Sequence, residues 1–195
     1  MTAPAILVVT GASGSGKTAT VRALEARALP GIRCYYFDAI GVPPIEQMRR
    51  DFGGPEQWQA VTTQRWLDQL TTTADGTEVC VLDGQTRPSF VRSAAERAGI
   101  AVARVVLLDA TPSVRHARLA GPRGQPDLAH SQMDCWAAYL RGQADALSVP
   151  VIDTTSLGIA SVADALIAFV EEVRGERRLA EQSDEPNGAS PRRLS

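Results

Sequence analysis

The sequence predicts a doubly wound α/β fold with a five-stranded parallel sheet and helices on both faces. Three observations predict it. Five short apolar runs recur along the 195 residues, segments with helical spacing separate them, and a glycine-rich turn joins the first run to the first helical segment. Buried parallel strands have such continuous apolar runs, and right-handed helical crossovers connect them.

The order of elements follows from this alternation. The predicted strands cover residues 5–10, 32–37, 79–83, 102–109 and 149–153. One helix follows the glycine-rich turn, and further helices are expected near residues 44–51, 55–73, 88–98, 112–119, 130–147 and 160–175. We expect one domain over residues 1–175. Because the chain ends in EQSDEPNGASPRRLS, with almost no apolar side chains to bury, residues 176–195 are predicted to form a disordered tail.

Composition limits the classes of function. The formal net charge is −2 and basic residues are scattered, which disfavours nucleic acid as a partner. Cys34, Cys80 and Cys135 lack the spacing of metal ligands and predict reduced thiols in a cytoplasmic protein. The start, MTAPAILVVTGASG, has no charged leader and only a short apolar run, so neither a signal peptide nor a membrane partner is predicted.

The glycine-rich turn carries the strongest signal. Residues 11–18 read GASGSGKT and match the pattern G-x-x-x-x-G-K-[ST] of a P-loop, between a strand and a helix. The glycines let the backbone curl so that its N–H groups point inward and cradle phosphate groups at a helix N-terminus. The residues predicted to bind ATP here are Gly11, Ala12, Ser13, Gly14, Ser15, Gly16, Lys17 and Thr18.

Lys17 is the chain's only lysine, among many arginines. An arginine presents a broad planar fork, whereas lysine delivers a compact charge on a thin stem that can thread a tight loop. We therefore expect Lys17 to reach the β- and γ-phosphates of ATP, and the Thr18 hydroxyl to bind Mg²⁺.

A second acidic site is expected at the end of a neighbouring strand. The run EVCVLDG supplies Asp83, which would hold Mg²⁺ through water. An aspartate in this place can also cap a turn, but the P-loop favours the metal role. The predicted cofactor is Mg²⁺, with ATP as the co-substrate.

The stretch VLDGQTRP resembles the D-G-x-P-R segment of adenylate kinase and related nucleoside monophosphate kinases. Asp83, Gly84 and Arg87 have the matching spacing, while Gln85 replaces an aromatic residue and Thr86 replaces proline. The resemblance implies a P-loop NTPase fold of the nucleoside monophosphate kinase type. It also implies that Gln85 and Arg87 bind the acceptor, whose identity the two departures leave open.

The run LLDATPSVRHARLAGPRGQPDL looks like the strand, helix and LID of the same superfamily. The resemblance implies a small LID over residues 118–130, in which Arg118 and Arg123 stabilise the transferred phosphoryl group. For Arg115 and Arg118, three residues apart on one helix face, a solvated role on an amphipathic helix stays open.

The run VPVIDTTSLGIASVADAL resembles the last strand and loop of these kinases. In them, backbone groups of this loop pack against the base of ATP, which would assign Thr154 and Thr155 to ATP binding. A simple helix cap explains the same residues.

The acceptor side begins at Asp38, which follows the second predicted strand. It looks like the aspartate of chloramphenicol phosphotransferase and similar kinases, which accepts the proton of the acceptor hydroxyl. A turn cap is the alternative for Asp38. Arg65, in the substrate-side helices expected over residues 44–73, is a further candidate for acceptor binding, while Trp58 and Trp66 are expected in the core.

Together these features predict a P-loop kinase. It would move the γ-phosphoryl of Mg·ATP to a small acceptor such as a nucleoside, nucleotide, sugar or antibiotic, and a hydroxyl acceptor is favoured. Asp38 suits an alcohol and Arg87 suits an anion, so both fit a substrate that has both groups. The alternatives are a P-loop ATPase or nucleotide switch that acts on a protein partner, and a module that only binds nucleotide. The oligomeric state cannot be read from the sequence.

Overall fold

The computed structural model describes residues 3–73, 76–121 and 123–184. Within these residues the strands form one parallel sheet with the order β2-β3-β1-β4-β5. The strands are β1 (Ala5–Thr10), β2 (Ile32–Tyr36), β3 (Val79–Asp83), β4 (Ala103–Asp109) and β5 (Val151–Asp153). The predicted doubly wound fold with a five-stranded parallel sheet is confirmed.

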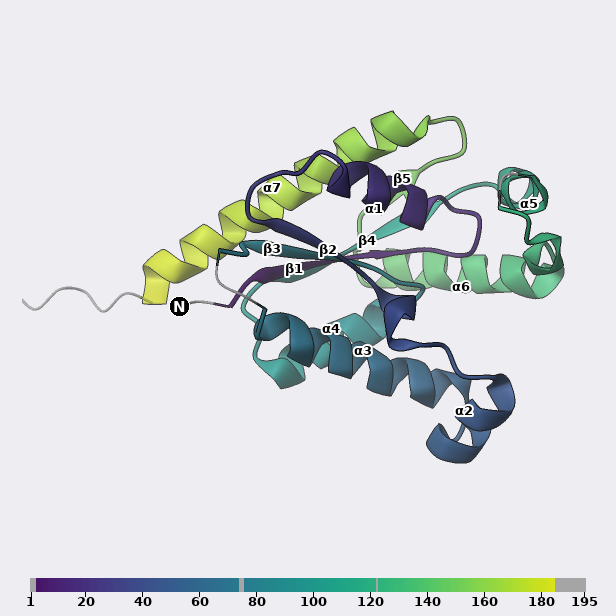
Figure 1. Cartoon of the computed structure of the whole chain (residues 1–195), viewed down its shortest axis with the longest axis horizontal. Coiled ribbons are helices and arrows are strands. Elements are labelled where there is room, and N and C mark those ends of the chain that lie inside the picture. The colour runs from purple at the N-terminus through teal and green to yellow at the C-terminus, as the bar shows by residue number, and fades with distance from the viewer. Residues whose placement is uncertain (1–2, 74–75, 122, 185–195) are drawn as a thin grey trace, which may run out of the picture.

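Helices cover both faces of this sheet (Figure 1). They are α1 (Lys17–Glu25), α2 (Ile45–Phe52), α3 (Pro55–Thr71), α4 (Pro88–Ala98), α5 (Pro112–Ala120), α6 (Ser131–Ala146) and α7 (Ile159–Asp184). Two short 3-10 helices, η1 (Phe37–Ile40) and η2 (Pro126–Leu128), follow β2 and α5. Helices α2 and α3 occupy the segment in which the substrate-side helices were expected.

The central strand β1 is apolar along its whole length because both of its faces are covered. Leu7 and Val9 belong to the core that includes Val21 of α1 and Leu166 of α7. On the other face, Ile6 packs in a core with residues of α3 and α4. Each such buried aliphatic side chain contributes about 1.5–3 kcal/mol to folding, which explains why this strand carries no amphipathic alternation.

The chain is helical beyond residue 175, which was the predicted end of the domain. Helix α7 runs to Asp184, so the prediction of a disordered tail is wrong for residues 176–184. Arg178 forms an ion pair with Glu78 at 2.9 Å, and Arg177 donates to the backbone oxygen of Ala3 at 3.1 Å. These contacts with the start of the chain and with the residue before β3 stabilise a polar helical turn that has little apolar surface. The rest of the predicted tail, 185–195, lies outside the described residues.

The P-loop lies at the point where the strand order reverses, between strands β3 and β4. Strand β1 lies between β3 and β4, and Val9 of β1 is opposite Asp83 of β3. Tyr36, at the end of β2, is opposite the same aspartate. Ligands of open parallel sheets bind at this crevice beyond the carboxyl ends of the strands. In the described part of the chain, no helix is both long and apolar enough to cross a membrane.

Candidate functional site

The P-loop conformation requires its glycines. Gly11, Gly14 and Gly16 have φ angles of 149°, 82° and 97°, which side-chain-bearing residues rarely adopt. A Cβ atom at Gly11 would lie 2.2 Å from the backbone oxygen of Leu108, and one at Gly14 would lie 2.7 Å from that of Arg115. The loop therefore packs against β4 and α5, and it delivers the chain to the N-terminus of α1 at Lys17.

Lys17 is buried inside this loop. Its Nζ donates to the backbone oxygen of Ala12 at 3.1 Å, and only 6% of the residue is exposed. Burial lowers the pKa of Lys17 to about 8, with a smaller lowering by Arg123, while the carboxylates of Asp83 and Asp38 oppose the shift. The structure thus brings four of the predicted site residues within electrostatic reach of one another.

Asp83 is buried beside Lys17 and fits a metal-binding role. Burial raises the pKa of its carboxyl, while Lys17 and a hydrogen bond with the Thr18 side chain oppose the increase. Its Oδ1 atom has no hydrogen-bond partner among the described residues, although it is buried. No group of three or more His, Cys, Asp or Glu able to hold a metal occurs in the described ranges. A cation here would therefore need phosphate or water oxygens besides Thr18 and Asp83, as Mg²⁺ bound to a nucleotide has.

A cavity of about 670 Å³, the nucleotide-side cavity, opens beside the P-loop and α1. Thr154 lines it, together with Leu157 and Ile159, whose apolar side chains are largely exposed. Thr155 points elsewhere, because its hydroxyl accepts from the backbone N–H of Thr111 and its own N–H donates to Asp153. Of Thr154 and Thr155, the two residues of this loop predicted to bind ATP, only Thr154 lines the cavity.

Arg118 connects α5 to the P-loop. Its Nη2 donates to the backbone oxygen of Thr154 at 2.6 Å, and its Nη1 donates to the Thr154 hydroxyl at 3.0 Å and to the backbone oxygen of Gly14 at 3.3 Å. The Thr154 hydroxyl also donates to the backbone oxygen of Ser15 at 2.8 Å. Arg118 lines the nucleotide-side cavity, but its guanidinium is engaged with the loops around it.

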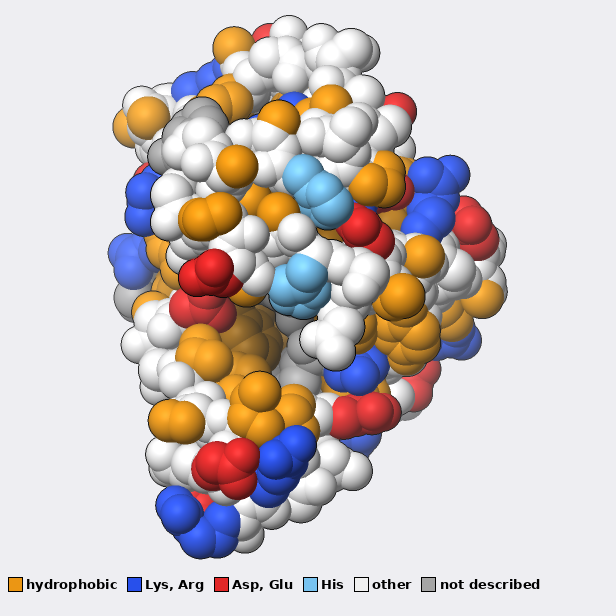
Figure 2. Space-filling model, turned by 90° about the vertical axis from the view of Figure 1, so that its right-hand side faces the viewer, with side chains coloured by type: hydrophobic (Ala, Val, Ile, Leu, Met, Phe, Trp, Pro, Cys, Tyr) orange, Lys and Arg blue, Asp and Glu red, His pale blue; other side chains and the backbone are white. Residues whose placement is uncertain are grey.

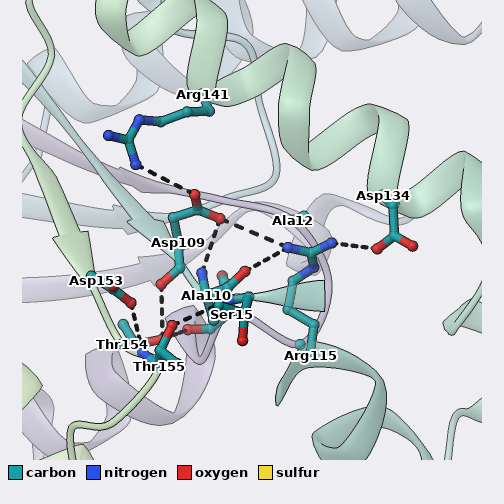
Figure 3. Close-up of polar contacts among 12 residues, drawn as sticks. Ala12, Ser15, Asp109, Ala110, Arg115, Asp134, Arg141, Asp153, Thr154 and Thr155 are labelled. Atoms are coloured by element: carbon teal, nitrogen blue, oxygen red, sulfur yellow. Dashed lines mark hydrogen bonds and ion pairs between the residues drawn. The ribbon is translucent and has the colours of Figure 1, made fainter. Parts of the chain in front are cut away.

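Arg115 of α5 has a structural role (Figure 3). It is 3% exposed, so the solvated role left open for it is wrong. Its guanidinium lies between Asp109 and Asp134 and donates to the backbone oxygen of Ala110 at 2.6 Å. Arg141 of α6 lies 3.7 Å from the other oxygen of Asp109. This network connects α5 and α6 to the end of β4.

A second cavity of about 390 Å³, the acceptor-side cavity, lies beside Lys17 and Asp38. Its walls include Asp38, Asp83, Gln85, Arg123 and Leu128. Figure 2 shows this side of the molecule hollowed between the segments that carry the two histidines, above, and α2, below. The cavity has room for a small molecule next to the P-loop.

Asp38 is exposed but lies on a firmly held turn. It is part of η1, and the first residue of η1, Phe37, is buried. The indole N–H of Trp66 donates to the backbone oxygen of Phe37 at 3.1 Å, and the Trp58 ring contacts the Phe37 ring edge-on. A Cβ atom at Gly84 would lie 2.8 Å from the Phe37 side chain, so this close packing needs glycine. Trp58 and Trp66 therefore pack in the core, as predicted, and hold the turn that presents Asp38.

Gln85 lies between the P-loop and the acceptor cavity. The Ser13 hydroxyl donates to its side-chain oxygen at 3.1 Å, and Gln59 of α3 donates to its backbone oxygen at 2.7 Å. Among the described residues, the side-chain N–H groups of Gln85 donate to no other group, so they are free to bind a ligand.

Arg87 and Arg65 do not line this cavity. The Arg87 guanidinium donates to Gln59 at 2.6 Å and to Glu56 at 3.3 Å. It also lies within 5.5 Å of the ring centroids of three aromatic residues, namely Phe90, Trp136 and Tyr139. Arg65 is exposed on α3. Neither arginine therefore shares the lining of this cavity with Asp38 and Asp83.

Arg22 was not predicted from the sequence. This residue of α1 lines both the nucleotide-side and the acceptor-side cavity, as do Thr18 and Arg123. Its spacing was the available signal, because residues four apart on a helix share a face and Arg22 follows Thr18 by four.

The comparisons with known proteins concern the fold. No family model matches the sequence, and no curated protein matches it. The structure is similar to a shikimate kinase from Acinetobacter baumannii in complex with shikimate, with a TM-score of 0.58, 16% identity, and coverage of 87% of this chain and 94% of that one. It is also similar to a gluconokinase from Sinorhizobium meliloti 1021, with a TM-score of 0.55, 21% identity, and coverage of 93% and 97%.

A third similar structure is the tunicamycin resistance protein of Deinococcus radiodurans. The TM-score is 0.59 at 24% identity, and the alignment covers 86% of this chain and 95% of that chain. At these identities the likeness is evidence for architecture. Together with the P-loop between β1 and α1, it confirms the predicted resemblance: the chain has the P-loop fold of the nucleoside monophosphate kinase type.

Proposed function

We propose that the chain is an ATP-dependent phosphotransferase that moves the γ-phosphoryl group of Mg·ATP to a hydroxyl group of a small molecule. One observation carries the proposal. Lys17 and Asp83 at the P-loop and the exposed carboxylate of Asp38 line one cavity of about 390 Å³, which meets the nucleotide-side cavity at Thr18.

The P-loop would bind the phosphates of ATP. The backbone N–H groups of such a loop and the N-terminus of α1 favour an anion. The Lys17 ammonium would add a positive charge whose effect is strong because Lys17 is buried. Thr154, Leu157 and Ile159 line the larger cavity, where an adenine and a ribose have room. Arg123 borders both cavities and would neutralise charge on the group in transfer.

Thr18 and Asp83 would hold Mg²⁺, Asp83 through water. The unpartnered Oδ1 atom of Asp83 supports this assignment. When bound, the ion neutralises charge on the β- and γ-phosphates and orients them.

Asp38 would act on the acceptor. Its carboxylate would accept the proton of the acceptor hydroxyl as that oxygen forms a bond to the γ-phosphorus. The bond between the γ-phosphorus and the bridging oxygen breaks, ADP leaves with that oxygen, and the phosphoryl group stays on the acceptor. Lys17 and Arg123 line the same cavity as Asp38. Their positive charges would therefore lie along the path of the phosphoryl group.

The cavity volume supports a small acceptor. The names of the similar structures agree with this class: one is a shikimate kinase bound to shikimate, and another is a gluconokinase. Shikimate is an alcohol that also carries a carboxylate. We therefore place hydroxylated carboxylic acids, sugars and nucleosides first among the acceptors to be tried.

The test is ADP release by the purified protein with Mg·ATP, with and without pooled acceptors. The pools are hydroxylated carboxylic acids, sugars, nucleosides, nucleoside monophosphates and hydroxylated antibiotics, and Lys17→Ala provides the blank. Stimulation by one pool supports the phosphotransferase. Steady hydrolysis that no pool changes would contradict it and favour an ATPase or switch that acts on a protein partner.

A further inference from the structure

We propose that Arg22 binds an anionic group of the acceptor, so that the substrate is a small alcohol with a carboxylate or phosphate group. This inference rests on the proposed phosphotransferase function. It assigns to Arg22 the anion-binding role that the sequence predicted for Arg87.

The place of Arg22 on α1 is the first support for this role. It follows Thr18 by one helical turn, so the two side chains share a face of the helix. Both line the nucleotide-side cavity and the acceptor-side cavity, and Asp38 lines the latter. A ligand whose hydroxyl group meets Asp38 therefore has a cation beside it on the same wall.

The guanidinium of Arg22 is also held in position without being neutralised. It lies over the ring of Tyr36, 5.9 Å from the centroid. The Tyr36 hydroxyl donates to Glu25 at 2.6 Å, which fixes the ring against α1. Tyr36 precedes Asp38 by two residues, so the ring that supports Arg22 and the turn that presents Asp38 belong to one segment.

Arg22 differs from the other candidate arginines because its guanidinium donors are not engaged by other described residues. Arg87 already donates to Gln59 and Glu56 and lies among three aromatic rings. Arg118 donates to backbone oxygens and to Thr154. Across the described ranges, the Arg22 guanidinium has no carboxylate within ion-pair distance and donates no hydrogen bond, so the Tyr36 ring is its observed contact. Its donors are therefore available for a carboxylate or phosphate.

The charges around the acceptor cavity also favour this role. Asp38 and Asp83 line the cavity and would repel an anionic substrate. Lys17 and Thr18 are assigned to the phosphates and Mg²⁺ of the nucleotide, and Arg123 to the group in transfer. Arg22 is then the cation on this wall that can offset the repulsion for an anionic acceptor.

The experiment compares pairs of acceptors in which a methyl ester or an alcohol group replaces the carboxylate and so removes the charge. The pairs are shikimate and methyl shikimate, gluconate and glucitol, and glycerate and glycerol, each assayed for ADP release with Mg·ATP. We expect the wild type to prefer the anionic member of at least one pair. In Arg22→Gln the KM of that member should rise about 10- to 100-fold, the range expected for a lost hydrogen bond to a charged group. The KM of the neutral member and the KM of ATP should change little.

Two further variants complete the test. Arg22→Lys, which keeps the charge without the planar fork, should recover part of the preference. Arg33→Gln removes an exposed arginine of β2 that lines neither cavity, so it should leave the preference unchanged.

A preference that survives in Arg22→Gln, or a change confined to the KM of ATP, would overturn the assignment of Arg22. If the nucleoside monophosphate pool stimulates ADP release, the nucleoside serves as the neutral member of the pair. If only pools of neutral acceptors stimulate ADP release, Arg22 has no anionic substrate to bind and the inference fails. If no pool stimulates ADP release, the proposed function fails as well.

Discussion

The nucleotide side and the acceptor side of the site differ in how fully their polar groups are engaged. On the nucleotide side, Lys17 contacts Ala12, and Arg118 joins Gly14 to Thr154. On the acceptor side, Asp38 is exposed and Arg22 rests on an aromatic ring without a partner carboxylate within the described residues. The first side is built before a ligand arrives, and the second offers charges that a ligand must satisfy.

This difference has a functional meaning. A preformed phosphate cradle lowers the reorganisation needed when ATP binds, since its dipoles are already oriented. Unpaired charges on the acceptor side leave affinity dependent on the chemical match with the substrate, which is a source of specificity. Nearby on this side, the side chains of Ile40, Val42 and Ile45 are also more than 40% exposed. Substitutions on the nucleotide side should therefore abolish transfer, whereas some on the acceptor side should alter selectivity.

The largest effect is expected at Lys17. Lys17→Ala should lower acceptor-stimulated ADP release by about 10³-fold, because it removes a buried charge from the phosphates. Lys17→Arg should not restore it, because the planar fork does not fit the loop. Thermal unfolding provides the control. Burial of the Lys17 cation is unfavourable, as its lowered pKa indicates, so Lys17→Ala should fold at neutral pH. Activity near that of the wild type in Lys17→Arg would contradict the role of the loop.

The second-largest loss of activity is expected at Asp38. Asp38→Asn should reduce turnover at least about 100-fold, the low end for loss of a general base, while the affinity for ATP stays unchanged. The side chain is exposed, so the substitution should not disturb folding. Single-turnover kinetics and nucleotide binding, measured on the same preparation, check this expectation. Unchanged turnover would leave Asp38 with the role of a turn cap.

The lowered pKa of Lys17 predicts a pH dependence of nucleotide binding. In the free protein Lys17 loses its proton near pH 8, and the phosphates of ATP favour the charged form, so its pKa should rise on binding. Binding should therefore take up a proton above pH 8 and weaken roughly tenfold between about pH 7.5 and 9. Calorimetry with a non-hydrolysable ATP analogue, in two buffers of different ionisation enthalpy, measures the uptake. The same pH dependence in Lys17→Ala would assign it to another group.

The lowered pKa of Lys17 also predicts how the free energy of unfolding depends on pH. Because the pKa of Lys17 is about 8 in the folded state and 10.5 for an exposed lysine, the unfolded chain binds more protons between these values. The contribution of Lys17 to the free energy of unfolding should therefore increase as pH rises from 8 to 10.5. Urea unfolding of the wild type and of Lys17→Met across this range measures the contribution as a difference. Parallel pH profiles of the two proteins would contradict the burial of a charged Lys17.

The smallest effect on activity is expected at Arg87. Arg87→Gln should lower the free energy of unfolding by about 1–2 kcal/mol, because Gln59 loses its partner and three rings lose their cation. The KM of the acceptor should change less than in Arg22→Gln. Urea unfolding and steady-state kinetics measure the two quantities. Wild-type stability combined with a larger rise in KM than that of Arg22→Gln would return the anion-binding role to Arg87.

The fold and the P-loop could be predicted from the sequence because their signals are local. A P-loop is one continuous motif, and the positions of Lys17 and Thr18 follow from its spacing alone. Asp83 follows from a buried strand that pairs with β1, which the apolar run already indicates.

The partners of the arginines could not be predicted, because they come from distant segments. Arg87 is covered by Trp136 and Tyr139 of α6, and the sequence gives no register between α4 and α6. The end of α7 was missed for the same reason, since Arg178 is held by Glu78, far away in the chain. Composition alone makes such a polar segment look disordered.

The central claim is that the γ-phosphoryl group of ATP passes to an alcohol. Its most direct test follows the label of γ-³²P-ATP in the presence of the acceptor pool that stimulates ADP release, for the wild type and Asp38→Asn. We predict that the wild type places the label in a phosphate ester of the acceptor and that Asp38→Asn forms little of that product. Label that appears only as inorganic phosphate, at equal rates with and without acceptor, would contradict the claim.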